Sequence, residues 1–493
     1  MSRAGDELAF LSATDLAALV RRKEVSPVEL VDLYLERIDQ LDGRLRAFIT
    51  VCPTEAREAA RRAERALAAG DPAPLLGVPF AVKDQFDTKG IRTTLGSRIL
   101  EAFVPDADAT VVARLTAAGA ILLGKLNLSE FALGGTVHFP SGQPRNPWNL
   151  AHHPGGSSGG SGVATAAALA AFTLGEDTGG SIRIPAAWCG TVGLRPTWGL
   201  VSRHGTFPAS WSMDTAGPLA RTVADAGLVL KLIAGQDPRE PLTTRRPVPD
   251  YPAALTGDIR GLRVGVVREL TEGGGTEPEV RAAVLAAATL LGTLGALIED
   301  VSLPLLPLAG ATFMAVCDSE ATTRQLGWLK TRPGDYDQGT RRRLLTASLL
   351  PTALYHQANR ARALIRQQVL DALATHDLLL CPTMHAPASR IEREQDAVTS
   401  KDVAARRFFG HRSHTTPASL AGAPAISVPC GFSTTGLPIG LQLVGRPYDE
   451  ARVLQVAHAY EQATDWHRHR PNPPVGSWGS SDSGCQLLAV RDP

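Results

Sequence analysis

The sequence predicts an α/β protein in which helices cover both faces of one β-sheet. Short apolar runs with strand character alternate along the chain with amphipathic helical segments, a pattern typical of a sheet buried between helices. The 493 residues would allow about three domains. The hydrophobic content of 44% and the absence of an internal repeat fit one large sheet domain as well.

Residues 1–70 are predicted to form an N-terminal helical portion that packs on the core. A capping-box-like pattern at Ser12 begins the first helix, and Ser26 caps a second helix that has Pro27 in its first turn. Apolar residues in the second helix recur at the three-to-four spacing of one buried face. The three helices are expected over residues 12–22, 26–42 and 54–69.

Residues 71–466 are predicted to form the α/β domain. Strands are expected over residues 75–82, 120–123, 262–267, 378–380, 425–428 and 439–444. Helices are expected over residues 108–118, 222–234 and 277–291, and over most of 337–374. Pro351 should break the last helical region, because proline removes a helical hydrogen bond. The proline-rich segment 235–261 is predicted to cross the surface, and residues 467–493 to form a polar C-terminal tail.

The stretch from Pro154 to Pro185 organises the domain. It holds two Gly/Ser clusters, at 155–162 and 178–183, separated by an Ala-rich segment that is predicted to be a buried helix. Glycine lets backbone N–H groups approach a ligand closely. Flexible linkers are the alternative reading of such clusters. This pair lies inside an apolar run, which favours a site.

Charge and composition exclude several classes of function. The net charge of +1 gives no electrostatic case for nucleic acid or an anionic membrane. We find neither a signal peptide nor an uninterrupted apolar run of about 18 residues, so a soluble cytoplasmic protein is expected. The cysteines show no zinc-binding spacing and are predicted to be free, mostly buried thiols. They are Cys52, Cys189, Cys317, Cys381, Cys430 and Cys485.

Two ordered motifs resemble a known family. GGSSGGS at 155–161 is followed by DTGGSIRIPAAWCGTVGLRPT from residue 177, and similar segments extend over residues 10–465. Together they resemble the amidase signature family of Ser–cisSer–Lys hydrolases. The resemblance implies one large mixed sheet between helices and no metal or organic cofactor. It also makes the N-terminal helices either a packing surface or a homodimer interface, and the sequence does not choose between the two.

The resemblance assigns a role to each reacting side chain. Ser181 would be the nucleophile, Ser157 the bridging serine with a cis peptide bond before it, and Lys83 the base. A serine nucleophile needs such a base together with an oxyanion site. The donors of the oxyanion hole would be the backbone amides of Thr178, Gly179, Gly180 and Ser181. Asp177 and Arg183 are expected to orient this loop through hydrogen bonds.

Lys83 stands out on physical grounds as well. Only seven of the 50 basic residues are lysines, and only lysine, when desolvated, can give up its proton at working pH. Lowering its pKa by about three units is worth about 4 kcal/mol, which burial can supply. The alternative is a strand-end lysine with its amine in solvent. Lys125 nearly completes a phosphate-binding loop, but Leu126 replaces the required Ser/Thr, so Lys125 is predicted to be structural.

The function implied by the resemblance is hydrolysis of a neutral C–N acyl bond through a serine acyl-enzyme. The substrate would be a small-molecule amide, anilide or carbamate, in an acyl pocket shaped by Leu133, Gly134 and Trp211. One alternative is the glutaminase subunit of a Glu/Asp-tRNA amidotransferase. That subunit should carry an acidic residue just before its TTP-like segment, and residues 411–417 hold none. A non-catalytic scaffold that keeps the fold is the other alternative.

Overall fold

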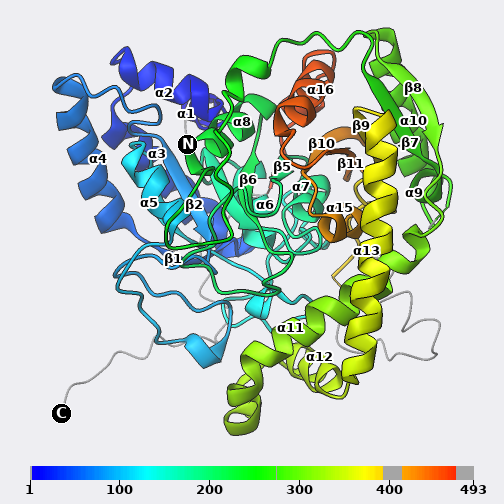
Figure 1. Ribbon diagram of the computed structural model, residues 1–493. Helices are drawn as coiled ribbons and strands as arrows, with labels where there is room; N and C mark the ends of the chain where they lie inside the picture. The colour runs from blue at the N-terminus through cyan, green and yellow to red at the C-terminus, as the bar shows by residue number, and fades with distance from the viewer. Residues whose placement is uncertain (1–2, 274, 392–413, 474–493) are drawn as a thin grey trace.

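One mixed sheet of 11 strands runs through the molecule (Figure 1). The computed structural model describes residues 3–273, 275–391 and 414–473. The strand order is β1-β3-β2-β4-β6-β5-β10-β11-β9-β7-β8. The predicted fold class, a single large mixed sheet between helices, is confirmed.

The strands combine two parallel groups with an antiparallel centre. β2 runs parallel to β3 and β4, and β7 runs parallel to β8 and β9. The other pairs are antiparallel. The strands are β1 (Phe48–Val51), β2 (Pro79–Lys83), β3 (Ile121–Leu126), β4 (Phe172–Glu176), β5 (Val192–Arg195), β6 (Ala216–Ala220), β7 (Arg263–Val267), β8 (Leu297–Val301), β9 (Leu378–Pro382), β10 (Ala425–Phe432) and β11 (Pro438–Gly445).

Helices follow most strands. They are α1 (Arg3–Ala9), α2 (Ala13–Arg21), α3 (Pro27–Leu45), α4 (Pro53–Ala68), α5 (Thr110–Ala117), α6 (Gly159–Ala166), α7 (Arg183–Cys189), α8 (Val223–Ile233), α9 (Arg268–Thr271), α10 (Pro278–Thr293), α11 (Ala309–Thr331), α12 (Gln338–Ser348), α13 (Thr352–Thr375), α15 (Thr416–Ala421) and α16 (Glu450–Gln462). The predicted break at Pro351 is confirmed, because it separates α12 from α13.

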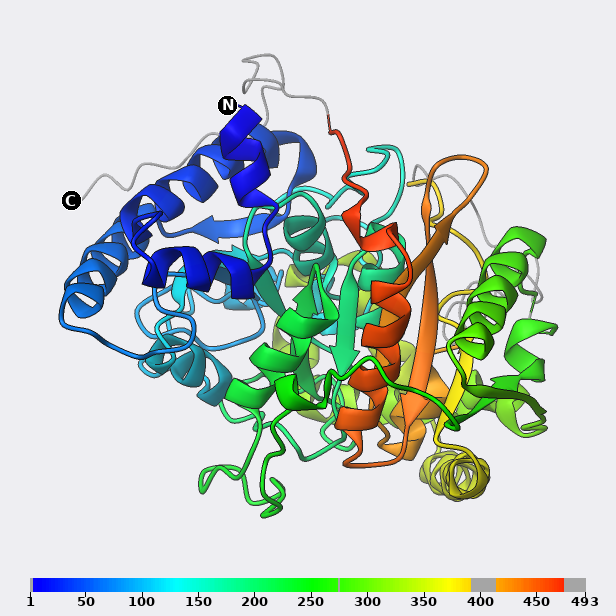
Figure 2. The same ribbon diagram turned by 90° about the horizontal axis from the view of Figure 1, so that it is seen from above.

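Two groups of helices cover the sheet. α6 and α7 pack on each other and on the central strands, α6 on β4 and β6 and α7 on β5, β10 and β11. α8 and α16 pack side by side, as Figure 2 shows, and cover β6, β10 and β11. α11, α12 and part of α13 extend beyond the sheet (Figure 1). Because α6 and α7 begin at the two Gly/Ser clusters, this packing fixes both clusters against the sheet.

The N-terminal helices form where the sequence predicts them. Ser26 and Glu29 make a reciprocal capping box at the start of α3, with Pro27 in its first turn. Leu30, Tyr34 and Ile38 lie on the buried face of α3 and join the main hydrophobic cluster of the molecule.

The Ala-rich segment between the two clusters differs from its prediction. α6 ends at Ala166, and the chain then turns through Ala168, whose φ is +50°. Residues 172–176 form β4, which pairs with β2 and β6 in the centre of the sheet. A run buried on every side has no polar face to reveal its period, so its second half could not be recognised as a strand.

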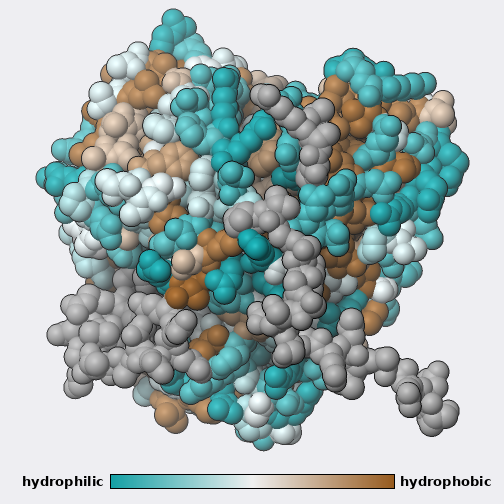
Figure 3. All heavy atoms as spheres, turned by 180° about the vertical axis from the view of Figure 1, so that it is seen from behind, coloured by the Kyte–Doolittle hydropathy of each residue, from teal (hydrophilic) through white to brown (hydrophobic). Residues whose placement is uncertain are grey.

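The surface of the molecule is polar over large areas (Figure 3), and the cysteines that the structure describes lie in the interior. Hydrophilic residues cover much of the face shown in Figure 3, and hydrophobic residues gather in smaller areas between them. No helix in the described ranges is both long and apolar enough to cross a membrane. The five cysteines in those ranges are buried and free, as predicted, and Cys485 lies outside them. Most of the predicted tail also lies outside them.

Candidate active site

Ser157 lies in the loop that leads into α6. The Gly156–Ser157 peptide bond is cis, as the family resemblance implies. Gly155 must be glycine here, because its φ is +85° and a Cβ atom would lie 2.8 Å from the backbone of Pro185. The Ser157 side chain is buried. The backbone carbonyl of Ser157 accepts a hydrogen bond from Ser129 N–H at 3.2 Å.

Lys83 reaches Ser157 from the end of β2. Its Nζ atom donates to Ser157 Oγ at 2.8 Å, and the side chain has no exposed surface. The alternative reading of a solvent-facing lysine is therefore wrong. β2 and β4 are parallel neighbours, so their carboxyl ends bring Lys83 and Glu176 to the same edge of the sheet.

An ion pair accompanies this contact. Glu176 Oε2 lies 3.1 Å from Lys83 Nζ, and the Glu176 carbonyl oxygen lies 3.4 Å from it. Burial lowers the pKa of Lys83, and the Glu176 carboxylate opposes that shift. The sequence predicts the desolvation of Lys83 but not its carboxylate partner.

Ser181 lies in the second loop, between β4 and α7. Its side chain is partly exposed, and its carbonyl accepts a hydrogen bond from Ser158 N–H at 3.3 Å. This bond holds the loop of Ser157 against the loop of Ser181. The structure therefore brings Lys83 into contact with Ser157 and places Ser181 on the adjoining loop.

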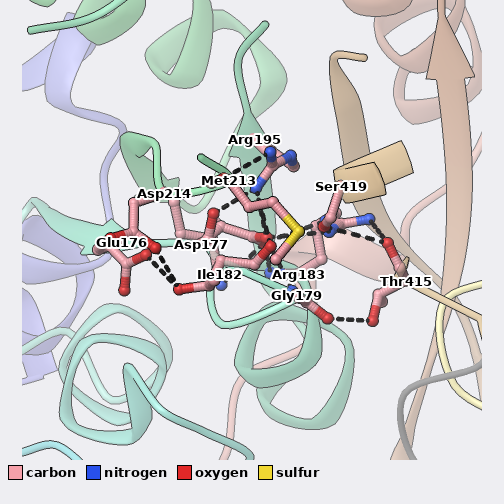
Figure 4. A network of polar contacts seen from close by, with 12 residues as sticks. Glu176, Asp177, Gly179, Ile182, Arg183, Arg195, Met213, Asp214, Thr415 and Ser419 are labelled. Carbon is pink, nitrogen blue, oxygen red and sulfur yellow. Dashed lines mark hydrogen bonds and ion pairs between the residues drawn. The ribbon is translucent and has the colours of Figure 1, made fainter. Parts of the chain in front are cut away.

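Asp177 lies at the centre of the network of polar contacts that Figure 4 shows. Its carboxylate accepts from Gly180 N–H at 2.8 Å, from Arg183 Nη2 at 2.9 Å and from Arg195 Nη1 at 3.0 Å. Burial alone would raise the pKa of Asp177, but the two guanidinium groups hold it well below its usual range. These bonds are of the kind expected of Asp177 and Arg183 as residues that orient the loop. Arg195, on β5, was not predicted.

The set of oxyanion donors needs one correction. The Gly180 N–H, one of the four predicted donors, points to Asp177 because φ at Gly180 is +125°. Among the described residues we find no acceptor for the backbone N–H groups of Thr178, Gly179 and Ser181. That these three amides bind an oxyanion stays a prediction.

A second acidic residue lies beside Glu176. The Thr178 hydroxyl lies 2.8 Å from Glu176 Oε1 and 2.8 Å from Asp214 Oδ1. Burial raises the pKa of Asp214 well above its usual value, and Glu176 raises it further. Figure 4 shows Glu176 and Asp214 at one end of the network. Neither residue was predicted from the sequence as part of the site.

The predicted pocket residues lie in different surroundings. Leu133 is 2% exposed and belongs to a hydrophobic cluster with Phe131, and Gly134 follows it with a φ of +75°. Trp211 is 55% exposed. Their contact with a substrate stays a prediction. Lys125 is structural as predicted, because it is buried and donates to the Phe86 carbonyl at 2.8 Å.

Asp177→Asn should destabilise the protein by about 3–5 kcal/mol, because it leaves Arg183 and Arg195 buried without their counter-charge. Urea unfolding would measure this loss. The matched control is Asp258→Asn at an exposed pair with Arg260, which should leave the stability nearly unchanged because solvent screens the pair. Equal stability of the two variants would contradict the organising role of Asp177.

The chain matches known proteins over nearly its whole length. The family model described as Amidase matches residues 29–454. The chain is 43% identical to the A subunit of the glutamyl-tRNA(Gln) amidotransferase of Roseiflexus sp. (strain RS-1), over 94% of this chain and 99% of that protein.

Two solved structures extend this likeness to three dimensions. The A subunit of the glutamyl-tRNA(Gln) amidotransferase of Thermotoga maritima superposes with a TM-score of 0.80 at 34% identity, covering 95% of this chain and 98% of that one. The native peptide amidase of Stenotrophomonas maltophilia gives the same TM-score of 0.80 and 34% identity, covering 94% and 98%.

Proposed function

The chain belongs to the amidase family of amide-cleaving enzymes, and on that premise we propose that Ser181 attacks a neutral amide to form an acyl-enzyme. The observation that carries this proposal is the 2.8 Å contact between Lys83 Nζ and Ser157 Oγ in a buried site that adjoins the Ser181 loop. A buried amine that touches a hydroxyl can activate a serine nucleophile, since the hydroxyl passes the proton on.

Acylation follows from these positions. Lys83 accepts the proton of Ser157 Oγ while Ser157 takes the proton of Ser181 Oγ, which bonds to the carbonyl carbon. The electron pair of the C=O bond moves to oxygen, where the free amides of the Ser181 loop stabilise the negative charge. When the C–N bond breaks, the proton returns through Ser157 to the departing nitrogen.

Deacylation uses the same groups with water in place of the amide. Lys83 and Ser157 draw a proton from a water molecule, whose oxygen attacks the acyl carbon. Ser181 leaves as the ester bond breaks and regains its proton from Ser157. The products are a carboxylic acid and an amine or ammonia. Amides, anilides and carbamates all present the required acyl–nitrogen bond.

A second candidate, which the relatives favour over a free-standing amidase, is glutamine hydrolysis within an amidotransferase. The 43% identity to the Roseiflexus amidotransferase chain over 99% of its length supports it, and it would require partner subunits. Against it stands the segment before α15, where no carboxylate occurs between residues 411 and 417. Residues 411–413 lie outside the described ranges. In the described part of the segment, which begins at residue 414, Thr415 Oγ1 donates to the Gly179 carbonyl at 2.6 Å. This segment therefore borders the nucleophile loop.

One assay separates these candidates. The purified chain is incubated with glutamine, simple carboxamides, anilides and carbamates, and released ammonia or amine is measured against the Ser181→Ala variant. Turnover of carboxamides or anilides by the chain alone supports the first candidate. Release of ammonia from glutamine that needs co-purified subunits supports the second. Release no faster than that of Ser181→Ala with every substrate, with and without those subunits, would contradict both.

A further inference from the structure

Lys83 lies between two groups that can exchange protons with it. Ser157 Oγ lies 2.8 Å from its Nζ atom, and Glu176 Oε2 lies 3.1 Å from it. The Glu176 side chain is 1% exposed. The pair is therefore shielded from bulk solvent, and a proton that leaves Lys83 has a carboxylate within hydrogen-bonding distance.

A second carboxyl group, Asp214, shares a hydroxyl with Glu176. Thr178 Oγ1 lies 2.8 Å from both Glu176 Oε1 and Asp214 Oδ1. One hydroxyl proton can serve only one of these oxygens at a time. Asp214 also accepts from Ala209 N–H at 2.8 Å and from Ser210 N–H at 2.9 Å. Burial raises the pKa of Asp214, and these hydrogen bonds oppose that shift.

The other charged groups near the pair form one cluster. Asp177 is the next acidic residue along the chain, and its carboxylate is paired with both Arg183 and Arg195. One carboxylate between two guanidinium groups leaves this cluster with one net positive charge. Glu176 is the carboxyl group that lies within hydrogen-bonding distance of Lys83 Nζ.

We propose that Glu176 is the terminal proton acceptor of the relay and acts through Lys83 as a positioning residue. The inference rests on the proposed function, since it requires Ser181 as the nucleophile. As Ser181 Oγ bonds to the carbonyl carbon, its proton moves to Ser157 and the proton of Ser157 moves to Lys83. Lys83 gives one of its own protons to Glu176 Oε2.

The step balances in protons and charge. One proton moves in net terms from Ser181 to Glu176, and Lys83 ends with as many protons as it began. The negative charge moves from the Glu176 carboxylate to the substrate oxygen. When the C–N bond breaks, Glu176 returns its proton through Lys83 and Ser157 to the departing nitrogen. The relay then does not require a lysine that is neutral in the resting enzyme.

A simpler role for Glu176 predicts the opposite pH dependence. A carboxylate that only pairs with Lys83 stabilises the ammonium, so removing it would make Lys83 easier to deprotonate. If the Glu176 carboxylate accepts a proton from Lys83 during the reaction, the enzyme can react at a pH below the pKa of Lys83. Without that carboxylate, Lys83 would first have to lose a proton to solvent, and the reaction would require a higher pH. Glu176→Gln separates these roles, because the amide keeps the size and the hydrogen bond but cannot take up the proton.

The test measures the rate at which a fluorophosphonate labels Ser181 across the pH range, so no substrate needs to be known. The acid limb of the profile is the pH range over which the labelling rate rises with pH. In Glu176→Gln this limb should lie about 1 pH unit or more higher than in the wild-type protein. The labelling rate at pH 7 should therefore fall by about tenfold or more. A limb that moves to lower pH, or does not move, would overturn the proposal. If the wild-type protein is not labelled at Ser181, the proposed function itself fails.

A second variant keeps the proposal testable. Asp214→Asn is the matched variant, because it removes the neighbouring carboxyl group and keeps the size of the side chain. It should move the limb less than Glu176→Gln does. A larger shift would place the accepting carboxyl on Asp214 and reject Glu176.

Discussion

Replacing Ser181 by alanine should lower kcat by about 10⁴-fold or more, because no acyl-enzyme can form without its Oγ atom. Binding and the free amides of the loop would remain, but they stabilise a charge that no longer develops on this path. The assay is the substrate panel described above, followed at saturating concentrations of the best substrate so that kcat is measured.

The fold should survive this change. The Ser181 side chain is partly exposed, so the melting temperature of Ser181→Ala should stay within a few degrees of the wild-type value. Ser161→Ala is the matched control, because Ser161 is a serine of the other Gly/Ser cluster and lies at the start of α6. Its hydroxyl donates to the Leu174 carbonyl, so this variant should lose about 1 kcal/mol of stability and keep its turnover. Full activity in Ser181→Ala would remove the nucleophile assignment.

Replacing Lys83 by methionine should lower kcat by about 10²–10⁴-fold, the usual contribution of a general base. Methionine keeps the unbranched chain but has no proton to exchange with Ser157. The acid limb of the pH profile should also disappear, since the base whose protonation lowers the rate on that side has been removed. The measurement is kcat from about pH 5 to pH 10 for both proteins, a range that spans both limbs of a bell-shaped profile.

Lys125→Met supplies the comparison. Lys125 is also buried and pairs with Asp84 at 3.1 Å, but it contacts neither Ser157 nor Glu176 in the described structure. Its loss should cost about 3–5 kcal/mol of stability because Asp84 would be left buried without a cation. The folded fraction should keep its pH profile. Equal effects of the two variants on kcat and pH dependence would contradict a specific role for Lys83.

The sequence was most informative where a local signal indicated the structure. Ser26, Pro27 and an amphipathic face mark α3, and an apolar run that ends in a charge marks Lys83. β4 was missed because its residues are buried on all sides and show no period. β6 was missed because it contains Pro218, which argues against a strand inside a sheet.

The residues of the candidate site also fall into those that a sequence pattern reveals and those that it does not. Ser157, Ser181 and Lys83 belong to ordered motifs, so the family resemblance could assign them. Asp214 and Arg195 come to the site only through the strand order, which no local pattern reveals. Glu176 carried a signal that could have been used: like Lys83, it is a charged residue at the end of an apolar run. Such a residue requires a partner when it is buried.

The central claim is that the hydroxyl of Ser181 becomes covalently bonded during the reaction. Its most direct test is peptide mapping by mass spectrometry after treatment with a fluorophosphonate, on wild-type protein and on Lys83→Met. We expect one adduct on the peptide that contains Ser181, formed much more slowly in the variant. An adduct on Ser157 or another serine, or labelling that does not depend on Lys83, would contradict the mechanism.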